Sequence, residues 1–388
     1  MAAPLRFYEF FAGGGMARAG LGSGWDCAFA NDFDPKKAAA YARNWGGGHI
    51  VCGDVAALTA VDLPGAADLA WASFPCQDLS LAGARAGLGG PEAVTRSGTF
   101  WPFWRLMRAL RAEGRAPRMV VLENVVGALR SHGGQDFAAI CGALAAGGYR
   151  VGALVIDAVD FLPQSRPRVF FVAADATLPL PSESLAAGPD LRWHPRALAE
   201  AQAKLDPQTA AAWLWWRLPV PPLRRKTLTD LIEEEPAGVC WNAPAKTARI
   251  LDLMGPIHRA RVVAAQAAGG RQVGTLYRRT RPGPDGQPMQ RAEVRFDGVA
   301  GCLRTPSGGS SRQIILVVEG EEIRSRLLSP REAARLMGLP DSYRLPERYG
   351  DAYHLAGDGV CVPVVRHLSM ELLAPVLGRD ESRVLAAE

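Results

Sequence analysis

Residues 5–15 of the chain, LRFYEFFAGGG, decide the fold. The bulky apolar side chains up to Phe11 predict a buried strand, and the glycines from Gly13 onward predict a tight turn. Residues 16–21 then have the composition of a helix. A strand, a glycine turn and a helix form the first crossover unit of a nucleotide-binding sheet, so we expect an α/β protein.

The glycine turn predicts a place where the backbone approaches a ligand. Gly13 and Gly15 have no Cβ, so a bound molecule could lie against their main chain. The dinucleotide fingerprint requires glycine or alanine at position 18, where this chain has Arg18, so a pyrophosphate site is weakly supported. A turn that only starts a helix is the structural alternative.

Acidic residues end the next two predicted strands. Residues 26–30 form the second strand, and Asp32 at its tip is placed to accept both hydroxyls of a ribose. Phe33 beside it offers a ring for stacking on a purine, and Asp54 at a third strand end could accept the amino group of adenine. Each alone could be a solvated loop residue, but the series favours a ligand that contains adenosine.

A cysteine follows the buried strand expected at residues 69–73. Pro75 stops regular pairing, so Cys76 would be presented at the open end of a strand, where α/β proteins place their ligands. Most free cysteines are small buried hydrophobes, and on position alone that alternative stays open. The long irregular segment 78–98 is rich in glycine and arginine, which is typical of a lid.

Charged side chains border two more buried strands. Glu123 follows the strand that begins at Met119, and it would face the same crevice as Cys76 if the two strands run parallel. Arg166 and Arg168 alternate with small residues at the entry to a further strand, so we expect both on one face, with an anionic or carbonyl partner. A structural salt bridge would meet the same requirement.

The composition is that of an ordinary globular chain with two domains. The chain has 388 residues, of which 48% are hydrophobic and 21% are charged, and a single core rarely grows to that length. No run of about 18 apolar residues is present, so we expect no membrane-spanning helix. Seven scattered cysteines and the lack of a leader pattern favour a reducing cytoplasm.

Basic residues are concentrated in one section. Residues 190–313 hold 19 Lys and Arg against 11 Asp and Glu, whereas the whole chain carries only +5. This asymmetry suits a polyanion bound through one part of the protein, and a solvated arginine-rich face explains it equally well. A capping box at Ser329-Pro330-Arg331-Glu332 predicts a helix and the return of the αβ pattern.

Five motifs in a fixed order resemble those of the DNA cytosine-5 methyltransferases, a family with bacterial members in restriction-modification systems. They are Phe11-Ala12-Gly13-Gly14-Gly15, Phe74-Pro75-Cys76-Gln77, Glu123-Asn124-Val125, Gln164-x-Arg166-x-Arg168 and Gly357-Asp358-Gly359-Val360. The resemblance implies an α/β, Rossmann-like S-adenosylmethionine-dependent methyltransferase sheet with helices on both faces. We expect this catalytic, cofactor-binding domain at 1–185, a smaller irregular β-rich target-recognition domain at 186–324, and a C-terminal segment at 325–388 that packs back onto the first domain.

The resemblance also implies a chemistry for the motif residues. Cys76 would attack carbon 6 of cytosine, because carbon 5 is a poor nucleophile until a thiolate has added. Glu123 would hydrogen-bond ring nitrogen 3 and the amino group, and Arg168 would hold the carbonyl oxygen at carbon 2. Arg166 would support the site electrostatically. A stacked base is out of reach, so the cytosine must be flipped out of the duplex.

S-adenosyl-L-methionine is the implied cofactor, and no metal is expected. The implied cofactor-binding residues are Phe11, Gly13, Gly15, Asp32, Phe33, Asp54, Val55, Pro75, Asp358 and Val360. Asp358 stands where the family usually has asparagine, which adds a carboxylate near the site. The candidate DNA contacts are Gln77, Ser80, Arg85, Arg96 and Arg304.

The implied partner is double-stranded DNA, bound by a monomer in the bacterial cytoplasm, at the nucleoid and without a membrane. A cognate restriction endonuclease could accompany it. Three other classes stay open: an RNA cytosine-5 methyltransferase, a DNA-binding relative without turnover, and a nicotinamide-dependent oxidoreductase. The basic section argues against the first, because reading a duplex requires such a surface. The intact Cys76, Glu123 and Arg168 argue against the second, and Arg18 argues against the third.

Overall fold

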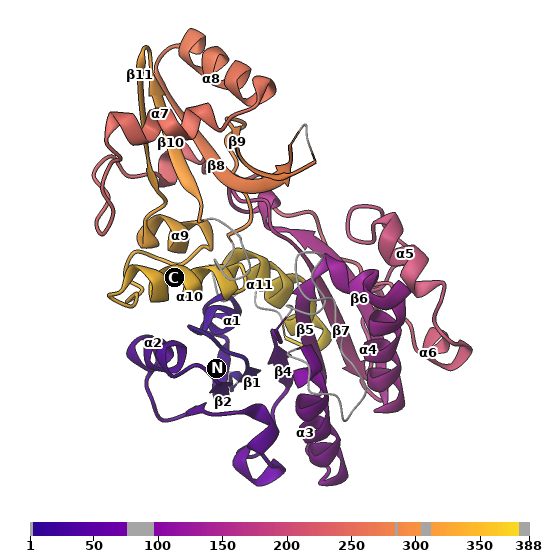
Figure 1. Cartoon of the computed structure of the whole chain (residues 1–388). Helices are drawn as coiled ribbons and strands as arrows, with labels where there is room; N and C mark the ends of the chain where they lie inside the picture. Colours follow the sequence, from indigo (N-terminus) through magenta and orange to yellow (C-terminus); the bar gives the residue numbers. More distant parts are fainter. Residues whose placement is uncertain (1–2, 76–96, 284–285, 304–311, 380–388) are drawn as a thin grey trace. The chain divides into compact units, whose positions relative to one another are not determined.

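The computed structural model describes residues 3–75, 97–283, 286–303 and 312–379, which form two units. The first unit comprises Met1–Asp157, Pro167–Pro221 and Val360–Glu388, and the second comprises Ala158–Arg166 and Pro222–Gly359. Each unit is organised around its own sheet (Figure 1). The chain therefore leaves the first unit twice and returns to it twice.

Within the described residues, the first unit is built on a seven-stranded sheet of order β3-β2-β1-β4-β5-β7-β6. Its strands are β1 (Leu5–Phe10), β2 (Trp25–Asp32), β3 (Ile50–Cys52), β4 (Leu69–Ala72), β5 (Met119–Val125), β6 (Tyr149–Asp157) and β7 (Pro167–Asp175). β1 to β5 pair in parallel, whereas β7 runs antiparallel to β5 and β6. The ends of the parallel strands and the start of β7 consequently lie at one edge of the sheet.

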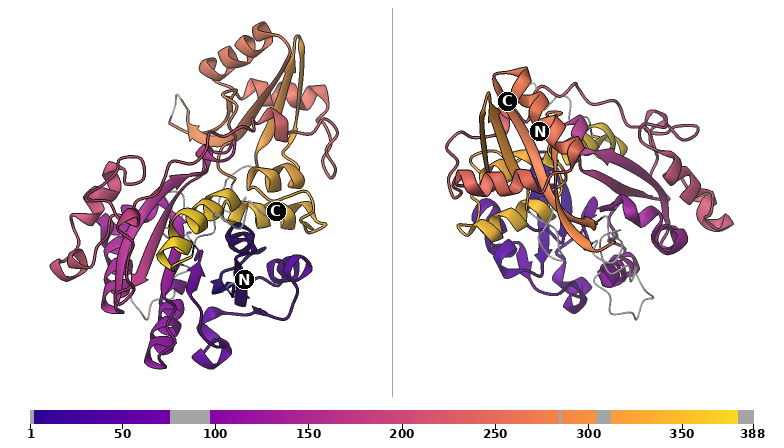
Figure 2. Two further views of the ribbon diagram at one scale, coloured as in Figure 1. Left: turned by 180° about the vertical axis from the view of Figure 1, so that it is seen from behind. Right: turned by 45° about the horizontal axis from the view of Figure 1, so that its top comes forward.

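Helices cover both faces of this sheet (Figures 1 and 2). On one face, α3 (Phe100–Ala112) and α4 (Gln135–Ala146) bury their apolar sides in a common core with the strands. On the other face, α1 (Met16–Leu21) packs so closely on α11 (Val362–Leu368) that a Cβ on Gly20 would lie 2.3 Å from Cβ of Val365. The remaining helices of this unit are α2 (Pro35–Trp45), α5 (Arg196–Gln202), α6 (Pro207–Ala211) and α12 (Ala374–Val376). The expected α/β fold class is confirmed.

The second unit contains a four-stranded antiparallel sheet of order β11-β10-β8-β9. The strands are β8 (Arg271–Pro282), β9 (Pro288–Arg295), β10 (Ile314–Glu319) and β11 (Glu322–Leu327), and the helices are α7 (Pro244–Asp252), α8 (Pro256–Ala268), α9 (Pro330–Leu336) and α10 (Tyr349–Asp358). Apolar residues of α7 and α8, such as Ile250 and Val262, form a core with Leu276 and Leu316 of the sheet. This unit therefore has a hydrophobic core of its own.

The unit boundaries differ from the ranges expected from the sequence. Residues 186–221 belong to the first unit, and residues 325–359 belong to the second. The expected limit at 324 falls inside β11, which pairs with β10 along its whole length after a turn at Gly320. The second unit is also more regular than expected, because weak alternation in a sequence does not reveal which strands pair.

The capping box before α9 is confirmed. The N–H of Glu332 donates to the Ser329 hydroxyl at 3.1 Å, and the N–H of Ser329 donates to the Glu332 carboxylate at 2.7 Å. Pro330 occupies the first turn, where its missing N–H has no intrahelical partner to lose. The local sequence alone therefore determined where this helix begins.

Among the described residues, the run Tyr349–Val376 is long and apolar enough to cross a membrane, with a mean hydropathy of 1.3. It is interrupted, since α10 ends at Asp358 and α11 begins at Val362. Of the apolar 18-residue window within this run, 56% is buried inside the protein. A core helix meets the same criteria of length and composition, and burial accounts for this one.

Candidate active site

Glu123 and Arg168 face each other where β5 ends and β7 begins. Nε of Arg168 lies 3.0 Å from Oε1 of Glu123, and only 14% and 8% of their side-chain surfaces are exposed. The antiparallel register explains this contact: Arg168 is opposite Val125, so Glu123 is its diagonal neighbour on the same face. A largely buried carboxyl and guanidinium side by side can bind the polar edge of a ring through several hydrogen bonds.

The strand before the predicted nucleophile ends beside this pair. β4 is parallel to β5 with Ala72 opposite Leu122, so the chain from Ser73 leaves the sheet level with Glu123. The side-chain amide of Asn124 donates to the carbonyl of Phe74 at 3.2 Å, which fixes the segment that leads to Pro75. This positioning function of Asn124 was not predicted, because nothing in the local sequence indicates a hydrogen bond between neighbouring strand ends.

The turn after β1 adopts a left-handed conformation. Phe11 has φ 55° and Gly13 has φ 56°. A residue with a Cβ pays about 1–2 kcal/mol for this conformation, and such strain is concentrated at functional sites. Among the described residues, the space beside Gly13 is open, since a Cβ there would have none of their heavy atoms within 4 Å. The backbone of Gly13 is thus accessible to a ligand, which supports the expected close approach.

The carboxylate of Asp32 organises the same turn. Its Oδ2 accepts the N–H of Gly13 at 2.7 Å, and its Oδ1 accepts the N–H of Asp34 at 2.8 Å. Asp32 is only 7% exposed, and this burial raises the pKa of its carboxyl above the ordinary value. Each carboxylate oxygen has a second lone pair beside the one that accepts a main-chain N–H. The hydroxyls of the expected ribose could therefore still donate to Asp32.

Gly15 has a packing function that differs from the expected ligand contact. Its φ is 75°, and a Cβ at this position would lie 2.3 Å from Nε1 of Trp45. The same indole N–H donates to the carbonyl of Gly14 at 2.9 Å. The last residue of α2 therefore covers Gly15, so the glycine is required because a ring packs on it.

Two predicted cofactor residues stand exposed at the tips of β2 and β3. Phe33 is 73% exposed, so its ring is uncovered for stacking. Asp54 is exposed and caps the short helix Val55–Ala57 by accepting the N–H of Ala56 through one carboxylate oxygen. Val55 is buried, with 2% of its surface exposed.

Asn31 ties these strand tips together. Its side-chain amide donates to the carbonyls of Val51 and Gly53, at 3.0 and 2.9 Å. No function for Asn31 was predicted from the sequence. These two hydrogen bonds connect the end of β2 to the end of β3. They therefore fix the backbone next to Phe33 and Asp54.

The residues at these strand tips fit the adenosine part of S-adenosylmethionine. The ribose hydroxyls and the adenine amino group of S-adenosylmethionine are hydrogen-bond donors, and Asp32 and Asp54 supply acceptors for them. The adenosine half of a dinucleotide would use the same acceptors, and Arg18 in the third fingerprint position is what argues against a pyrophosphate. Phe33 supplies the aromatic surface that an adenine requires.

Arg166 does not share a strand face with Arg168, contrary to expectation. β7 begins at Pro167, and Arg166 belongs to the second unit. Its guanidinium, which is 3% exposed, donates to the carbonyls of Gly357 at 2.9 Å and Gly359 at 2.6 Å. Each arginine has a partner of the predicted kind. Arg166 donates to backbone carbonyls, and Arg168 pairs with the carboxylate of Glu123.

The glycines of the Gly357–Val360 motif suggest a tight turn, but the motif includes the end of α10. Asp358 is the exposed last residue of α10, and the carbonyls around it are held by Arg166. Val360 is buried, with 4% exposed, and begins the last segment of the first unit. The helix extends further than a glycine pair suggests because tertiary hydrogen bonds satisfy its final carbonyls.

Several predicted site residues lie outside the described residues. They are Cys76, Gln77, Ser80, Arg85, Arg96 and Arg304. Within the described ranges, no group of three or more His, Cys, Asp and Glu side chains is placed to hold a metal ion.

Glu9 was missed by the sequence reasoning. It is 1% exposed on β1, and its Oε1 accepts the N–H of Arg18 at 3.3 Å, whereas its Oε2 is buried without a hydrogen-bond partner. Burial raises the pKa of this carboxyl to about 8. The available signal was a single acid within the apolar run 5–11.

The sheet order, the glycine turn and the acidic strand tips define a Rossmann-like α/β protein. Its ligand site lies at the carboxyl ends of the strands, beside the paired Glu123 and Arg168. The family model of the C-5 cytosine-specific DNA methylases matches residues 5–374. The chain therefore belongs to this family of enzymes, and the resemblance seen in its motifs is confirmed.

Curated relatives and solved structures agree with this assignment. The Type II methyltransferase M.NlaX of Neisseria lactamica is 26% identical over 385 residues, which cover 98% of this chain and 100% of the relative. The Type II methyltransferase M.HhaI of Haemophilus parahaemolyticus is 23% identical, over 95% of this chain and 94% of the relative. The Entamoeba histolytica methyltransferase EhMeth has the same fold, with a TM-score of 0.61, 15% identity, and coverage of 97% and 99%.

Proposed function

We propose that the protein transfers a methyl group from S-adenosylmethionine to carbon 5 of a flipped-out cytosine in a specific duplex DNA sequence. A covalent bond between Cys76 and carbon 6 of the base would form and break in each cycle. The observation that carries this proposal is the contact between Glu123 and Arg168, 3.0 Å apart and largely buried. The two side chains offer complementary groups to one edge of a cytosine.

The proposed cycle begins at the base. The thiolate of Cys76 adds to carbon 6, and the electron pair of the ring double bond moves toward carbon 5. Glu123, in its protonated form, donates its proton to ring nitrogen 3, accepts from the amino group, and takes the proton back when the sulfur leaves, while Arg168 donates to the oxygen on carbon 2. These contacts stabilise the charge that the thiolate brings into the ring.

S-adenosylmethionine, when bound, supplies an electrophilic methyl group to carbon 5. A base, such as a water molecule, then removes the proton from carbon 5. The electron pair of that bond restores the ring double bond, and the sulfur of Cys76 leaves as thiolate. The protein's own contribution is to orient the base, to hold its edge and to keep the cofactor against the Gly13 turn.

The remaining groups of the site have positioning functions in this proposal. Asp32, Phe33 and Asp54 hold the adenosine part of the cofactor, and Asn124 holds the segment before Cys76 through the Phe74 carbonyl. Arg166 supports the carbonyls of Gly357 and Gly359. The second unit, with its arginine-rich β8 and β9, is proposed to contact the DNA.

The test is a trapping experiment on the full-length protein. A random-sequence duplex in which 5-fluorocytosine replaces cytosine is incubated with the protein and S-adenosylmethionine, then resolved on a denaturing gel. Fluorine cannot leave as a proton does, so the covalent complex should accumulate with wild type and be absent with Cys76→Ala. No adduct with wild type, or one that persists in Cys76→Ala, would contradict the proposal. A parallel incubation with 5-fluorocytosine RNA tests the RNA alternative.

A further inference from the structure

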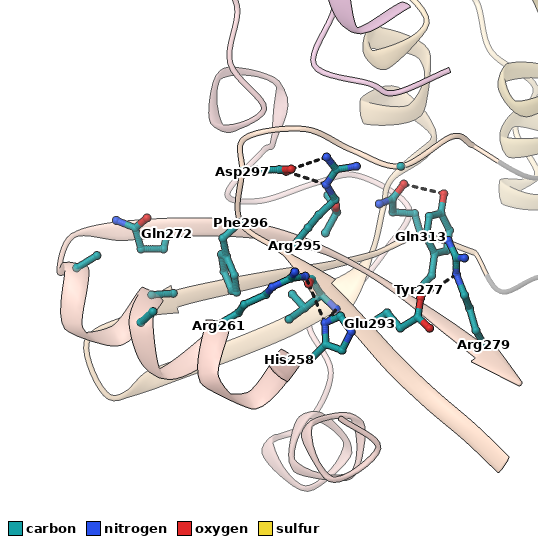
Figure 3. A pocket seen from close by; sticks show the side chains of 16 residues that line it. His258, Arg261, Gln272, Tyr277, Arg279, Glu293, Arg295, Phe296, Asp297 and Gln313 are labelled. Atoms are coloured by element: carbon teal, nitrogen blue, oxygen red, sulfur yellow. Dashed lines mark hydrogen bonds and ion pairs between the residues drawn. The ribbon is translucent and has the colours of Figure 1, made fainter. Parts of the chain in front are cut away.

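The second unit contains a hollow of about 730 Å³ that the proposed reaction does not use (Figure 3). Residues of α8, β8 and β9 line it, together with the loop that follows β9. A volume of this size is within the range of small-molecule sites. The chemistry of its lining indicates which kind of molecule fits.

Hydrogen-bond donors dominate the polar lining. Arg261, on α8, donates to the carbonyl of Val294 at 2.8 Å and has no carboxylate partner within the described parts of the chain. Nδ1 of His258 lies 3.1 Å from both the N–H and the carbonyl oxygen of Val294, so Nε2 is a donor in the tautomer in which Nδ1 accepts that N–H. Arginine and histidine donors that converge on one hollow favour the oxygens of a phosphate group.

Two acidic residues also line the hollow, and each is paired with an arginine. Nε of Arg279 lies 3.2 Å from Glu293, and Nε of Arg295 lies 2.7 Å from Asp297. These contacts hold both guanidinium groups in place (Figure 3). Arg261 therefore supplies an excess positive charge over these balanced pairs.

A buried amide at the hollow lacks a partner. Gln313 is 0% exposed and lines the hollow, and its Nε2 has no hydrogen-bond partner among the residues that the structure describes. The hydroxyl of Tyr277 lies 2.6 Å from the carbonyl of Cys302 and 2.8 Å from the Gln313 amide oxygen, yet it has one proton to donate. In either orientation of the amide, one polar atom of Gln313 stays unsatisfied, at a cost of about 1–3 kcal/mol. A ligand atom in the hollow would satisfy it.

Aromatic rings are held in the same hollow by glycines. A Cβ on Gly301 would lie 2.6 Å from the ring of Tyr277, and a Cβ on Gly274 would lie 2.6 Å from the ring of Phe296. Both rings line the hollow. The glycines permit a close approach of each ring to the main chain. Tyr277 is only 8% exposed, so the partly exposed ring of Phe296 is the surface on which a planar group can stack.

We infer that this hollow binds a nucleotide, with the phosphate at Arg261 and His258, the base against Phe296, and the base edge at Gln313. A side-chain amide pairs well with the edge of a base, and aromatic rings stack on bases of any sequence. The nucleotide has two possible sources, a free monophosphate or a nucleotide of bound DNA. Only the second source rests on the proposed function.

The test is isothermal titration of the full-length protein with each deoxynucleoside 5′-monophosphate, without cofactor. A second arm measures binding of a short random-sequence duplex and of its single strands, with amide hydrogen exchange over α8 and β8. In the arm that binds, Arg261→Ala and Gln313→Leu should each weaken the affinity roughly tenfold, as expected for one lost hydrogen bond to a charged or buried group. Exchange at α8 and β8 should slow on binding.

Arg259→Ala is the matched control, because Arg259 is exposed on the same helix and does not line the hollow. If the protein binds a monophosphate and Arg261→Ala weakens that binding, the hollow is a site for a free nucleotide. If Arg261→Ala weakens only the binding of DNA, the hollow holds a nucleotide of the polymer. Failure of both arms, or equal affinities for wild type, Arg261→Ala and Gln313→Leu, would overturn the inference. The trapping gel tests the proposed function separately, since the monophosphate arm requires neither DNA nor methyl transfer.

Discussion

The Arg168 guanidinium meets the Glu123 carboxylate at 3.0 Å because β7 runs antiparallel beside β5. The two residues are far apart in the chain, and strand register alone brings them together. Arg168→Lys keeps the charge but loses the planar fork, so turnover should fall roughly 10- to 100-fold. Methyl transfer to random-sequence DNA measures this.

Arg118→Lys is the control for that change. Arg118 lies 3.3 Å from Asp68 with 45% of its side chain exposed, and such pairs contribute about 0–1 kcal/mol. Its turnover should match that of wild type. An Arg168→Lys enzyme with full turnover would remove Arg168 from the proposed contact with cytosine.

Gly13→Ala should weaken the cofactor more than it slows the reaction. The substitution puts a Cβ at φ +56°, in the open space where we propose that the cofactor lies. We expect the KM for S-adenosylmethionine to rise roughly tenfold, which corresponds to about 1.4 kcal/mol. Steady-state kinetics at varied cofactor concentration separate this effect from a change in kcat.

Gly114→Ala provides the matched backbone control. Gly114 has φ +72° and equally open surroundings, but it follows α3, away from the turn after β1. Both variants should lose about 1 kcal/mol of stability through the same strain. Only Gly13→Ala should change the KM, and an equal change in both would point to general destabilisation.

Glu9 should make the stability of the first unit depend on pH. Burial raises the pKa of its carboxyl from 4.5 to about 8, against a smaller opposing effect of Arg18. The folded state thus keeps a proton that the unfolded state releases, so the free energy of unfolding should fall as pH rises from about 4.5 to about 8. The fall should be at most roughly 4 kcal/mol. Urea unfolding at several pH values measures it.

Glu9→Gln is the control, because glutamine has the shape of the protonated carboxyl and does not titrate. The variant should unfold with a flatter pH dependence and should be more stable than wild type above about pH 8. Identical pH profiles for the two proteins would show that Glu9 titrates normally.

Glu332→Gln should strongly destabilise the second unit. Glu332 lies 2.6 Å from Arg326, both side chains are fully buried, and the substitution leaves the arginine with an uncompensated charge. The expected loss is about 3–5 kcal/mol. Glu200→Gln breaks the exposed pair with Arg196 and should change stability by less than about 0.5 kcal/mol. Equal unfolding midpoints for the two variants would contradict this ranking.

The sequence by itself determined the elements whose causes are local. The apolar run and glycines at 5–15 specify a strand and a turn, and the Ser329 capping box specifies the start of α9. The five motifs were sufficient to indicate the family, because their order along the chain is itself a linear property.

Only the tertiary structure decided which side chains meet. The contact between Glu123 and Arg168 depends on where β7 is inserted in the sheet, and the division of labour between Arg166 and Arg168 depends on where β7 begins. The two hydrogen bonds that Asp32 accepts from the main-chain N–H groups of Gly13 and Asp34 also form only in the folded turn. Such contacts join residues distant in sequence through strand register and packing, which a local pattern of residues does not encode.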